Sequence, residues 1–280
     1  MNQWLRKILC GAIIMNYKKV PDEQSKVILK TEGLTKYYGG VKALQDADFV
    51  LQDGEHVAIV GDNGAGKSTF VRQITGTEIP TSGKIYFDGK LVNFNSPLEA
   101  RNAGIETVYQ NLALADDLDV PSNIFLGREE TFFNLGPFSF LNEKKMLEKS
   151  IEVLSKTGIK IPELKTQMGN MSGGQRQCVS ISRSASFASK LIIMDEPTAA
   201  LGVQETTQVE NIIRNLKERG IPLIMISHNL RQVLDLVEKI FVLRQGKIVG
   251  EVETAKTDGN EIVSLITGVK QNVHAQATYV

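Results

Sequence analysis

Residues 61 to 69 place three glycines, a lysine and two hydroxyl side chains at fixed spacing. The stretch reads Gly61-Asp62-Asn63-Gly64-Ala65-Gly66-Lys67-Ser68-Thr69 and fits the pattern G-x-x-x-x-G-K-[S/T]. Glycines let backbone N–H groups turn inward, and a helix expected directly afterwards points its positive dipole end at the same place. A loop of this kind binds phosphate groups. We expect Lys67 to reach the β and γ phosphates of a nucleotide and Ser68 to ligate Mg²⁺.

This motif alone predicts a nucleotide-binding P-loop and leaves kinases, GTPases, helicases and motor ATPases open. The residues of the loop that we expect to contact the nucleotide are Gly61, Asn63, Gly64, Gly66, Lys67, Ser68 and Thr69.

Two adjacent carboxylates, Asp195 and Glu196, follow the apolar run 191–194. At the carboxyl end of a buried strand, Asp195 is placed to hold Mg²⁺ directly or through water. Glu196 is the candidate to orient the attacking water and accept its proton. A solvated acidic pair at a strand end is the plainer interpretation, but the P-loop upstream favours a phosphoryl-transfer site.

A second stretch, Met171-Ser172-Gly173-Gly174-Gln175, opens an expected helix over 175–188 with a serine and two glycines. A helix start of this composition is another anion-binding feature. The stretch resembles the L-S-G-G-Q signature of ABC (ATP-binding-cassette) ATPases, with Met171 in place of leucine. The resemblance extends over residues 28–250 and rests on six motifs in the family's order.

The resemblance implies the ABC ATPase fold and a head-to-tail homodimer in which each signature covers the ATP held by the other subunit. Ser172 and Gly174 are then expected to touch the γ-phosphate of the partner's ATP, with Gln175 beside them. ATP and Mg²⁺ are the implied cofactors.

Three further residues match single family positions. Tyr38 resembles the aromatic residue that stacks on adenine, although the neighbouring Tyr37 is a rival. Gln110 resembles the Q-loop glutamine that senses Mg²⁺ and the water, and His228 resembles the switch histidine that donates to the γ-phosphate. Each of the three also has a plain structural interpretation, as a surface tyrosine, a polar loop residue or a structural histidine.

One departure from the family lies after Glu196. The D-loop S-A-L-D is replaced here by Ala199-Ala200-Leu201-Gly202, so the carboxylate is missing and Gly202 is expected to loosen the backbone. The coupling of the two ATP sites is therefore in question. The presence of Lys67, Asp195, Glu196 and His228 predicts that hydrolysis itself persists.

The elements that position these residues alternate along the chain. Strands are expected at 27–30, 49–51, 56–60, 84–87, 191–194, 222–226, 240–243 and 247–252, and helices at 68–74, 97–103, 142–157, 175–188, 204–219 and 230–238. The pattern predicts an α/β fold: a P-loop NTPase core whose mostly parallel sheet has helices on both faces, an antiparallel β subdomain and a helical insert at roughly 97–189. We expect the domain to span 27–270, with an extension at 1–26 and a tail at 271–280.

Composition excludes several classes of protein. The 32 basic and 32 acidic residues cancel, so we expect no nucleic-acid partner bound through bulk charge. Cys10 and Cys178 lack metal-ligand spacing and indicate a reducing compartment. The apolar runs are too short to cross a bilayer. Residues 4–15 could pass for a weak signal peptide, but the interruption at Cys10-Gly11 favours a floppy extension, with Met15 as a candidate start.

The stretch after Gln110, including Asn123-Ile124-Phe125-Leu126-Gly127-Arg128-Glu129, resembles that of monosaccharide importer ATPases of the ribose, xylose and fructose kind. This resemblance implies a peripheral subunit at the cytoplasmic face of the cell membrane. Its partners would be permease transmembrane subunits, seated beside the Q-loop, and a substrate-binding protein. An importer for an amino acid, lipid or metal, or an ABC ATPase that transports nothing, are the alternatives.

Overall fold

The computed structural model describes residues 26–110, 112–132, 140–157, 159, 161, 163–199 and 201–270. The expected tail at 271–280 and nearly all of the expected extension at 1–26 lie outside the described residues.

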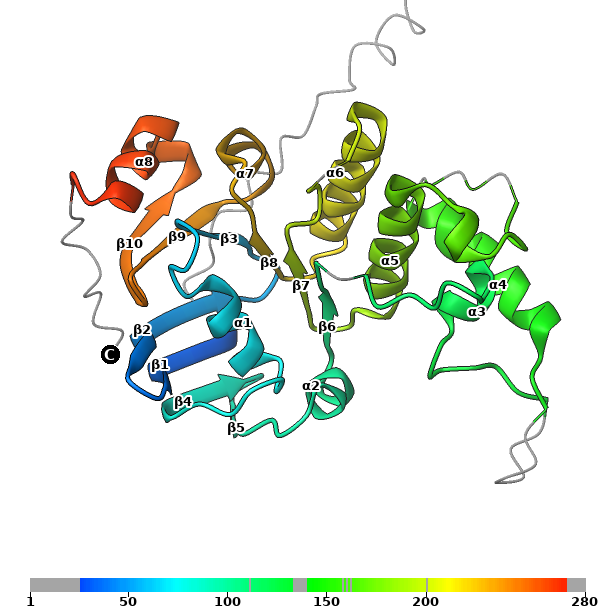
Figure 1. The fold of residues 1–280 in the computed structure, drawn as a ribbon, viewed down its shortest axis with the longest axis horizontal. Helices are drawn as coiled ribbons and strands as arrows, with labels where there is room; N and C mark the ends of the chain where they lie inside the picture. The colour runs from blue at the N-terminus through cyan, green and yellow to red at the C-terminus, as the bar shows by residue number, and fades with distance from the viewer. Residues whose placement is uncertain are drawn as a thin grey trace, which may run out of the picture.

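A six-stranded sheet forms the centre of the molecule (Figure 1). Its order is β10-β9-β3-β8-β7-β6, and all neighbours are parallel except β9 and β10. The strands are β3 (His56–Val60), β6 (Ile105–Val108), β7 (Leu191–Asp195), β8 (Leu223–Ile226), β9 (Lys239–Arg244) and β10 (Lys247–Glu253). The continuous apolar runs of β3, β7 and β8 arise because helices or a second sheet cover both faces. The predicted mostly parallel sheet is confirmed.

A second, antiparallel sheet has the order β2-β1-β4-β5. It consists of β1 (Val27–Tyr38), β2 (Val41–Gln52), β4 (Ser82–Phe87) and β5 (Lys90–Val92). β1 and β2 extend well beyond the expected strands at 27–30 and 49–51, and they meet at a hairpin around Gly39-Gly40. Register shifts interrupt the pairing of β1 with β2, and the hairpin end of both strands is exposed. The alternation of apolar and polar side chains is therefore broken, and it did not predict the full length of these strands.

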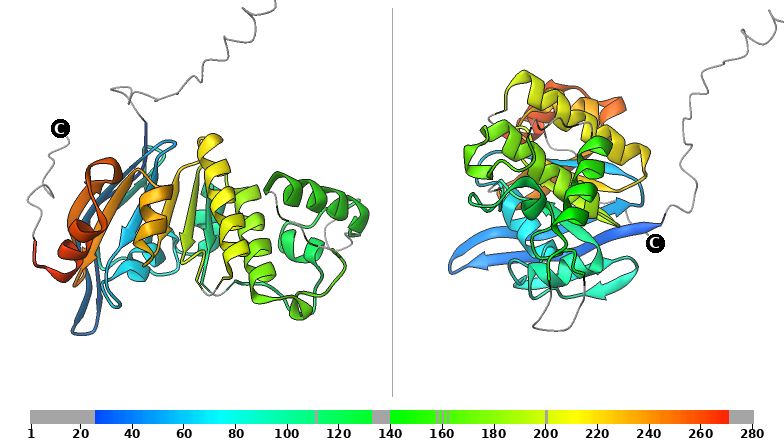
Figure 2. Two further views of the ribbon diagram at one scale, coloured as in Figure 1. Left: turned by 90° about the horizontal axis from the view of Figure 1, so that it is seen from above. Right: turned by 90° about the vertical axis from the view of Figure 1, so that its right-hand side faces the viewer.

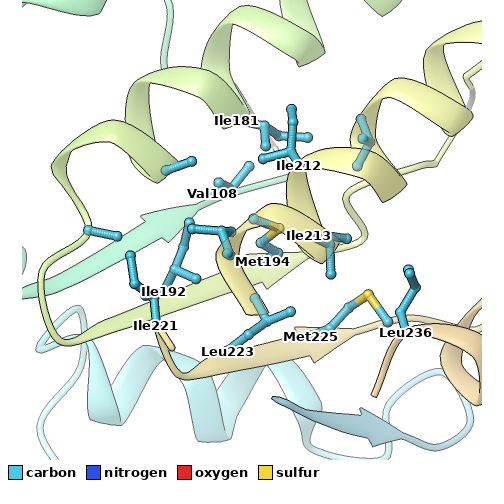
Figure 3. Packing of buried hydrophobic residues seen from close by; sticks show 14 of the residues in the cluster. Val108, Ile181, Ile192, Met194, Ile212, Ile213, Ile221, Leu223, Met225 and Leu236 are labelled. Carbon is cyan, nitrogen blue, oxygen red and sulfur yellow. The ribbon is translucent and has the colours of Figure 1, made fainter. Parts of the chain in front are cut away.

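The central sheet separates two apolar clusters. Along β7, Leu191 and Ile193 point into a cluster shared with the antiparallel sheet and helix α1 (Lys67–Ile74). Ile192 and Met194 point into the other cluster, against helices α5 (Gly173–Phe187), α6 (Val203–Glu218), α7 (Leu230–Leu236) and α8 (Gly259–Thr267). Figure 3 shows this second cluster between strands and helices. The alternation of a strand thus supplies both cores.

The helices between β6 and β7 lie at one end of the molecule (Figures 1 and 2). They are α3 (Val120–Ile124), α4 (Glu143–Thr157) and α5, and a 3-10 turn at Met168–Asn170 precedes α5. The stretch expected as a helical insert, 97–189, also contains helix α2 (Pro97–Ala103) and strand β6, which joins the central sheet beside β7. β6 was not predicted, because the polar residues Glu106 and Thr107 interrupt its apolar character.

Among the described residues, none of the helices has the length and apolar character needed to cross a membrane.

Candidate functional site

A cleft of about 720 Å³ opens at the carboxyl ends of β3 and β7. Eleven of the residues predicted from the sequence line it: Gly61, Asn63, Gly64, Gly66, Lys67, Ser68, Thr69, Gln110, Asp195, Glu196 and His228. They come from four separate segments of the chain, which the parallel strands bring to one edge of the sheet.

The P-loop follows β3 directly and leads into α1. Gly66 caps that helix with a φ of 107°, a conformation that favours glycine. A Cβ at Gly66 would lie 2.6 Å from the carbonyl oxygen of Ala43, so the loop has no room for a side chain there. The N–H of Gly246 donates to the carbonyl of Ala65 at 2.9 Å. A backbone hydrogen bond therefore connects the β9–β10 turn to the P-loop.

Lys67 is folded back onto the loop. Its Nζ donates to the carbonyl oxygens of Gly61 at 2.7 Å and Asp62 at 3.0 Å. Burial lowers the pKa of Lys67, and the nearby carboxylates of Glu196 and Asp195 oppose that shift. The Lys67 side chain is half-buried, so its charge acts more strongly on an anion than it would in bulk water.

Asp195 ends β7 and Glu196 follows it directly. Burial raises the pKa of Asp195, and the neighbouring Glu196 adds to the increase, whereas Lys67 opposes it. A carboxyl pair under this repulsion is stabilised by a cation.

Glu196 is held in an uncommon backbone conformation, with a φ of 52°. Its N–H donates to the carbonyl of Ile226 at 3.0 Å, and its Oε2 lies 2.8 Å from Nδ1 of His228. The Glu196 side chain is 17% exposed and that of His228 is 75% exposed. The two predicted catalytic side chains therefore form a contact between the ends of β7 and β8.

The donors expected for Mg²⁺ also fit that ion. Ser68, Gln110 and Asp195 all line the cleft and offer a hydroxyl, an amide and a carboxylate oxygen, the hard ligands that Mg²⁺ prefers. The described residues contain no cluster of three or more His, Cys, Asp or Glu side chains that could hold a metal by themselves. A cation here would share its coordination with phosphate oxygens and water.

Tyr38 lies beside the cleft rather than in its lining. Its hydroxyl donates to the Glu78 carboxylate. Burial and this hydrogen bond raise the pKa of Tyr38, while Thr69 and Arg72 of α1 oppose the shift. Between the two candidates for adenine stacking, Tyr38 is therefore in contact with the helix that follows the P-loop.

The signature residues stand apart from the cleft. Ser172 caps α5, accepting from the N–H of Gln175 at 3.2 Å, while the side chain of Gln175 accepts from the N–H of Ser172 at 3.0 Å. This reciprocal capping box fixes the helix start that the sequence predicted. Ser172, Gly174 and Gln175 are not among the residues that line the cleft of the same subunit.

Sequence reasoning missed several residues that line the cleft. They are Ala43, Asp62, Ala65, Ala199 and Ile226. Asp62 and Ala65 fill variable positions of the P-loop motif. Both contribute backbone carbonyl oxygens, which accept hydrogen bonds from Lys67 and Gly246. Ala43 reaches the cleft from β2, and no feature of the sequence indicated that approach.

Comparison with known proteins agrees with this geometry. A family model described as ABC transporter matches residues 44–199. The chain belongs to the ABC transporter family. It is an ABC-type ATPase, and ATP is the nucleotide of its cassette.

Two similar proteins match almost end to end. The xylose/arabinose import ATP-binding protein of Sulfolobus acidocaldarius is 44% identical over 86% of this chain and 94% of its own. The fructose import ATP-binding protein of Rhizobium meliloti is 42% identical over 87% and 95%. With a ribose import ATP-binding protein of Streptococcus agalactiae the identity is 37%, over 85% of this chain but only 47% of that protein.

Solved structures show the same cassette fold. A nucleotide-free ATP-binding cassette from an ABC transporter superposes with a TM-score of 0.72 at 28% identity, over 86% of this ABC ATPase and 95% of that chain. The ADP conformation of another cassette gives a TM-score of 0.71 at 29% identity, over 86% and 95%.

Proposed function

We propose that this ABC ATPase powers the import of a simple sugar from the cytoplasmic face of the cell membrane. The observation that carries the proposal is the cleft itself, in which Lys67, Gln110, Asp195, Glu196 and His228 surround one space. The cargo is inferred from the relatives named for xylose/arabinose and fructose import, which match nearly their whole length.

Hydrolysis at this site follows from the positions of the side chains. Lys67 exchanges the carbonyls of Gly61 and Asp62 for the β and γ phosphate oxygens of ATP. Glu196 accepts a proton from water as the water oxygen attacks the γ-phosphorus, and the bond to the bridging oxygen of ADP breaks. His228 leaves Glu196 to donate to the γ-phosphate.

Ser68, Gln110 and Asp195 would hold Mg²⁺, which would supply positive charge to offset the charge that develops on the phosphate oxygens. Tyr38 would stack on the adenine. The pKa of Asp195, raised in the protein alone, is then expected to fall when the cation is present.

The signature indicates that two subunits act together. Ser172 and Gly174 belong to a capped helix start that is exposed or half-buried and does not line the cleft of its own subunit. We propose that a second copy of the chain docks head to tail, so that each signature meets the ATP of the other subunit. ATP then closes the dimer, and loss of phosphate opens it.

A groove beside the Q-loop is the proposed seat of the permease. Arg101, Glu106, Tyr109 and Arg183 are among the residues that line it. Burial lowers the pKa of Arg183, and the nearby Arg101 adds to the effect. The groove therefore suits a helix that brings an acidic side chain. A separate substrate-binding protein would deliver the sugar to the permease.

The first experiment compares the wild type with Glu196→Gln. We expect the wild type to hydrolyse ATP and the variant to lose at least about a hundredfold in kcat. The variant should also accumulate as a dimer with ATP and Mg²⁺ in size-exclusion chromatography. Equal hydrolysis by both proteins would remove Glu196 from the mechanism.

Transport is tested by reconstitution with the permease in lipid vesicles. Xylose, arabinose, fructose and ribose are the trial sugars, and the Glu196→Gln protein is the matched control. ATP-dependent uptake of one sugar by the wild type alone is the expected result. Uptake of an amino acid, lipid or metal instead would overturn the choice of cargo but not the ATPase.

A further inference from the structure

Two buried glutamines contact the segment that directly follows Glu196. Gln177 lies on α5 and Gln232 lies on α7, with exposed fractions of 7% and 4%. Nε2 of Gln177 donates to the carbonyl oxygen of Pro197 at 3.0 Å. Oε1 of Gln232 accepts from the hydroxyl of Thr198 at 2.7 Å. Hydrogen bonds from two different helices therefore hold this segment.

The orientation of the Gln232 amide is fixed by its second partner. Its Nε2 donates to Oε1 of Glu210, on α6, at 3.1 Å. A carboxylate only accepts, so the NH₂ group must face Glu210 and the amide oxygen must face Thr198. Each polar atom of this buried amide has a partner of the right kind. Such a network specifies a single arrangement, and breaking one bond leaves a buried group unsatisfied.

The helices that carry the glutamines begin at other parts of the site. α5 starts at the Ser172 cap, less than two turns before Gln177. α7 starts at Asn229, directly after His228, and the Asn229 side chain accepts from the N–H of Gln232 at 3.3 Å. The segment after Glu196 is thus tied to the signature helix on one side and to the element of the switch histidine on the other.

We propose that Gln177 and Gln232 are positioning residues for ATP hydrolysis. Through Pro197 and Thr198 they fix the direction in which Glu196 leaves the end of β7. Its carboxylate then moves together with the signature helix and with His228, and reaches the attacking water only when both are in place. This inference rests on the proposed role of Glu196 as the base.

Exchanging the amide and the carboxylate of the Gln232–Glu210 pair tests the link through Gln232. Gln232→Glu sets a carboxylate against Glu210 and removes the donor, so kcat should fall about tenfold or more while the KM for ATP stays within about twofold. Adding Glu210→Gln in the same chain restores one donor facing one acceptor, and most of kcat should return. A recovery of this kind depends on the hydrogen bond and not on the size of either side chain.

A second pair of variants tests the link through Gln177. Gln177→Leu removes the donor to Pro197 and should lower kcat with little change in nucleotide affinity. Gln208→Leu is the matched control, because Gln208 lies on α6 and accepts a 3.5 Å hydrogen bond from Cys178, away from the segment after Glu196. The control should keep kcat near that of the wild type.

All variants are measured as full chains for kcat, KM, affinity for a non-hydrolysable ATP analogue and thermal midpoint. The proposal is overturned if Gln232→Glu keeps wild-type kcat, or if the double variant stays as slow as the single one. It is also overturned if kcat, affinity and thermal midpoint fall together, because that pattern indicates a merely structural role. A wild type insensitive to Glu196→Gln would instead refute the proposed site itself.

Discussion

At the start of β3, the His56 imidazole is fully buried and uncharged. Burial lowers its pKa to about 4, although the Glu238 carboxylate opposes the shift. Nε2 lies 3.0 Å from the carbonyl oxygen of Ile221, which requires a proton on that nitrogen, and Nδ1 has no hydrogen-bond partner within the described part of the chain. The folded protein therefore prefers the neutral ring more strongly than the unfolded chain does.

This preference makes stability depend on pH in one direction. The unfolded chain takes up a proton near pH 6.5 and the folded protein only near pH 4, so stability is retained above pH 6.5 and lost as the pH falls between these values. The loss due to His56 should be about 3 kcal/mol by pH 4.

Urea unfolding of the wild type and His56→Gln at several pH values between 7.5 and 4.5 isolates this contribution. The difference in unfolding free energy between the two proteins should shrink as the pH falls. Parallel pH profiles would show that His56 does not titrate as described.

At the scale of elements, the capping box of α5 links local folding to assembly. Ser172→Ala removes the acceptor for the Gln175 N–H and should cost about 1 kcal/mol of stability. It also removes the hydroxyl proposed to meet the partner's ATP. Introduced into the Glu196→Gln protein, it should weaken the ATP-dependent dimer at least about tenfold, as measured by sedimentation at a series of protein concentrations.

Ser96→Ala is the matched control for that prediction. Ser96 caps α2 by accepting from the N–H of Glu99 at 3.3 Å, and α2 has no proposed role in the dimer. The two variants should lose a similar free energy of unfolding, whereas only Ser172→Ala should weaken the ATP-dependent dimer. If both weaken the dimer alike, the effect comes from helix stability alone.

Elements with a strong local signal were predictable from the sequence. The P-loop residues and the α5 cap follow from residue types at fixed spacing, and Asp195 and Glu196 follow from carboxylates at the end of an apolar strand. Gln110 and His228 were found only through the resemblance to the family. Elements whose character depends on distant partners were missed. β6 is a strand because β7 lies beside it, and α8 (Gly259–Thr267) packs on a cluster assembled from remote segments. Gln177 and Gln232 gave no signal either, because their importance lies in which backbone they touch.

At the scale of the whole molecule, one sheet separates two cores that stabilise the fold together but serve the site differently. In the core shared with the antiparallel sheet, Phe49 packs against Phe70 of α1 at 5.2 Å and Phe241 of β9 at 4.5 Å between ring centroids. That core supports the P-loop helix directly. The opposite core, which includes Ile212, supports helices α5 to α8.

Truncating a side chain in either core should therefore lower the free energy of unfolding by a similar amount. Only the truncation in the core beneath the P-loop helix should also weaken nucleotide binding. Phe70→Ala should cost about 3–5 kcal/mol and Ile212→Ala about 2–5 kcal/mol of unfolding free energy, because both side chains are fully or almost fully buried. Phe70 lies one turn after Lys67, and its ring packs on Phe49, so the loss of the ring removes packing that holds the P-loop helix in place. Urea unfolding with and without ATP measures both effects. ATP should stabilise Ile212→Ala as much as the wild type and Phe70→Ala less, because stabilisation by a ligand depends on its affinity for the folded state. Equal stabilisation of the two variants would show that the P-loop keeps its geometry without the aromatic core beneath it.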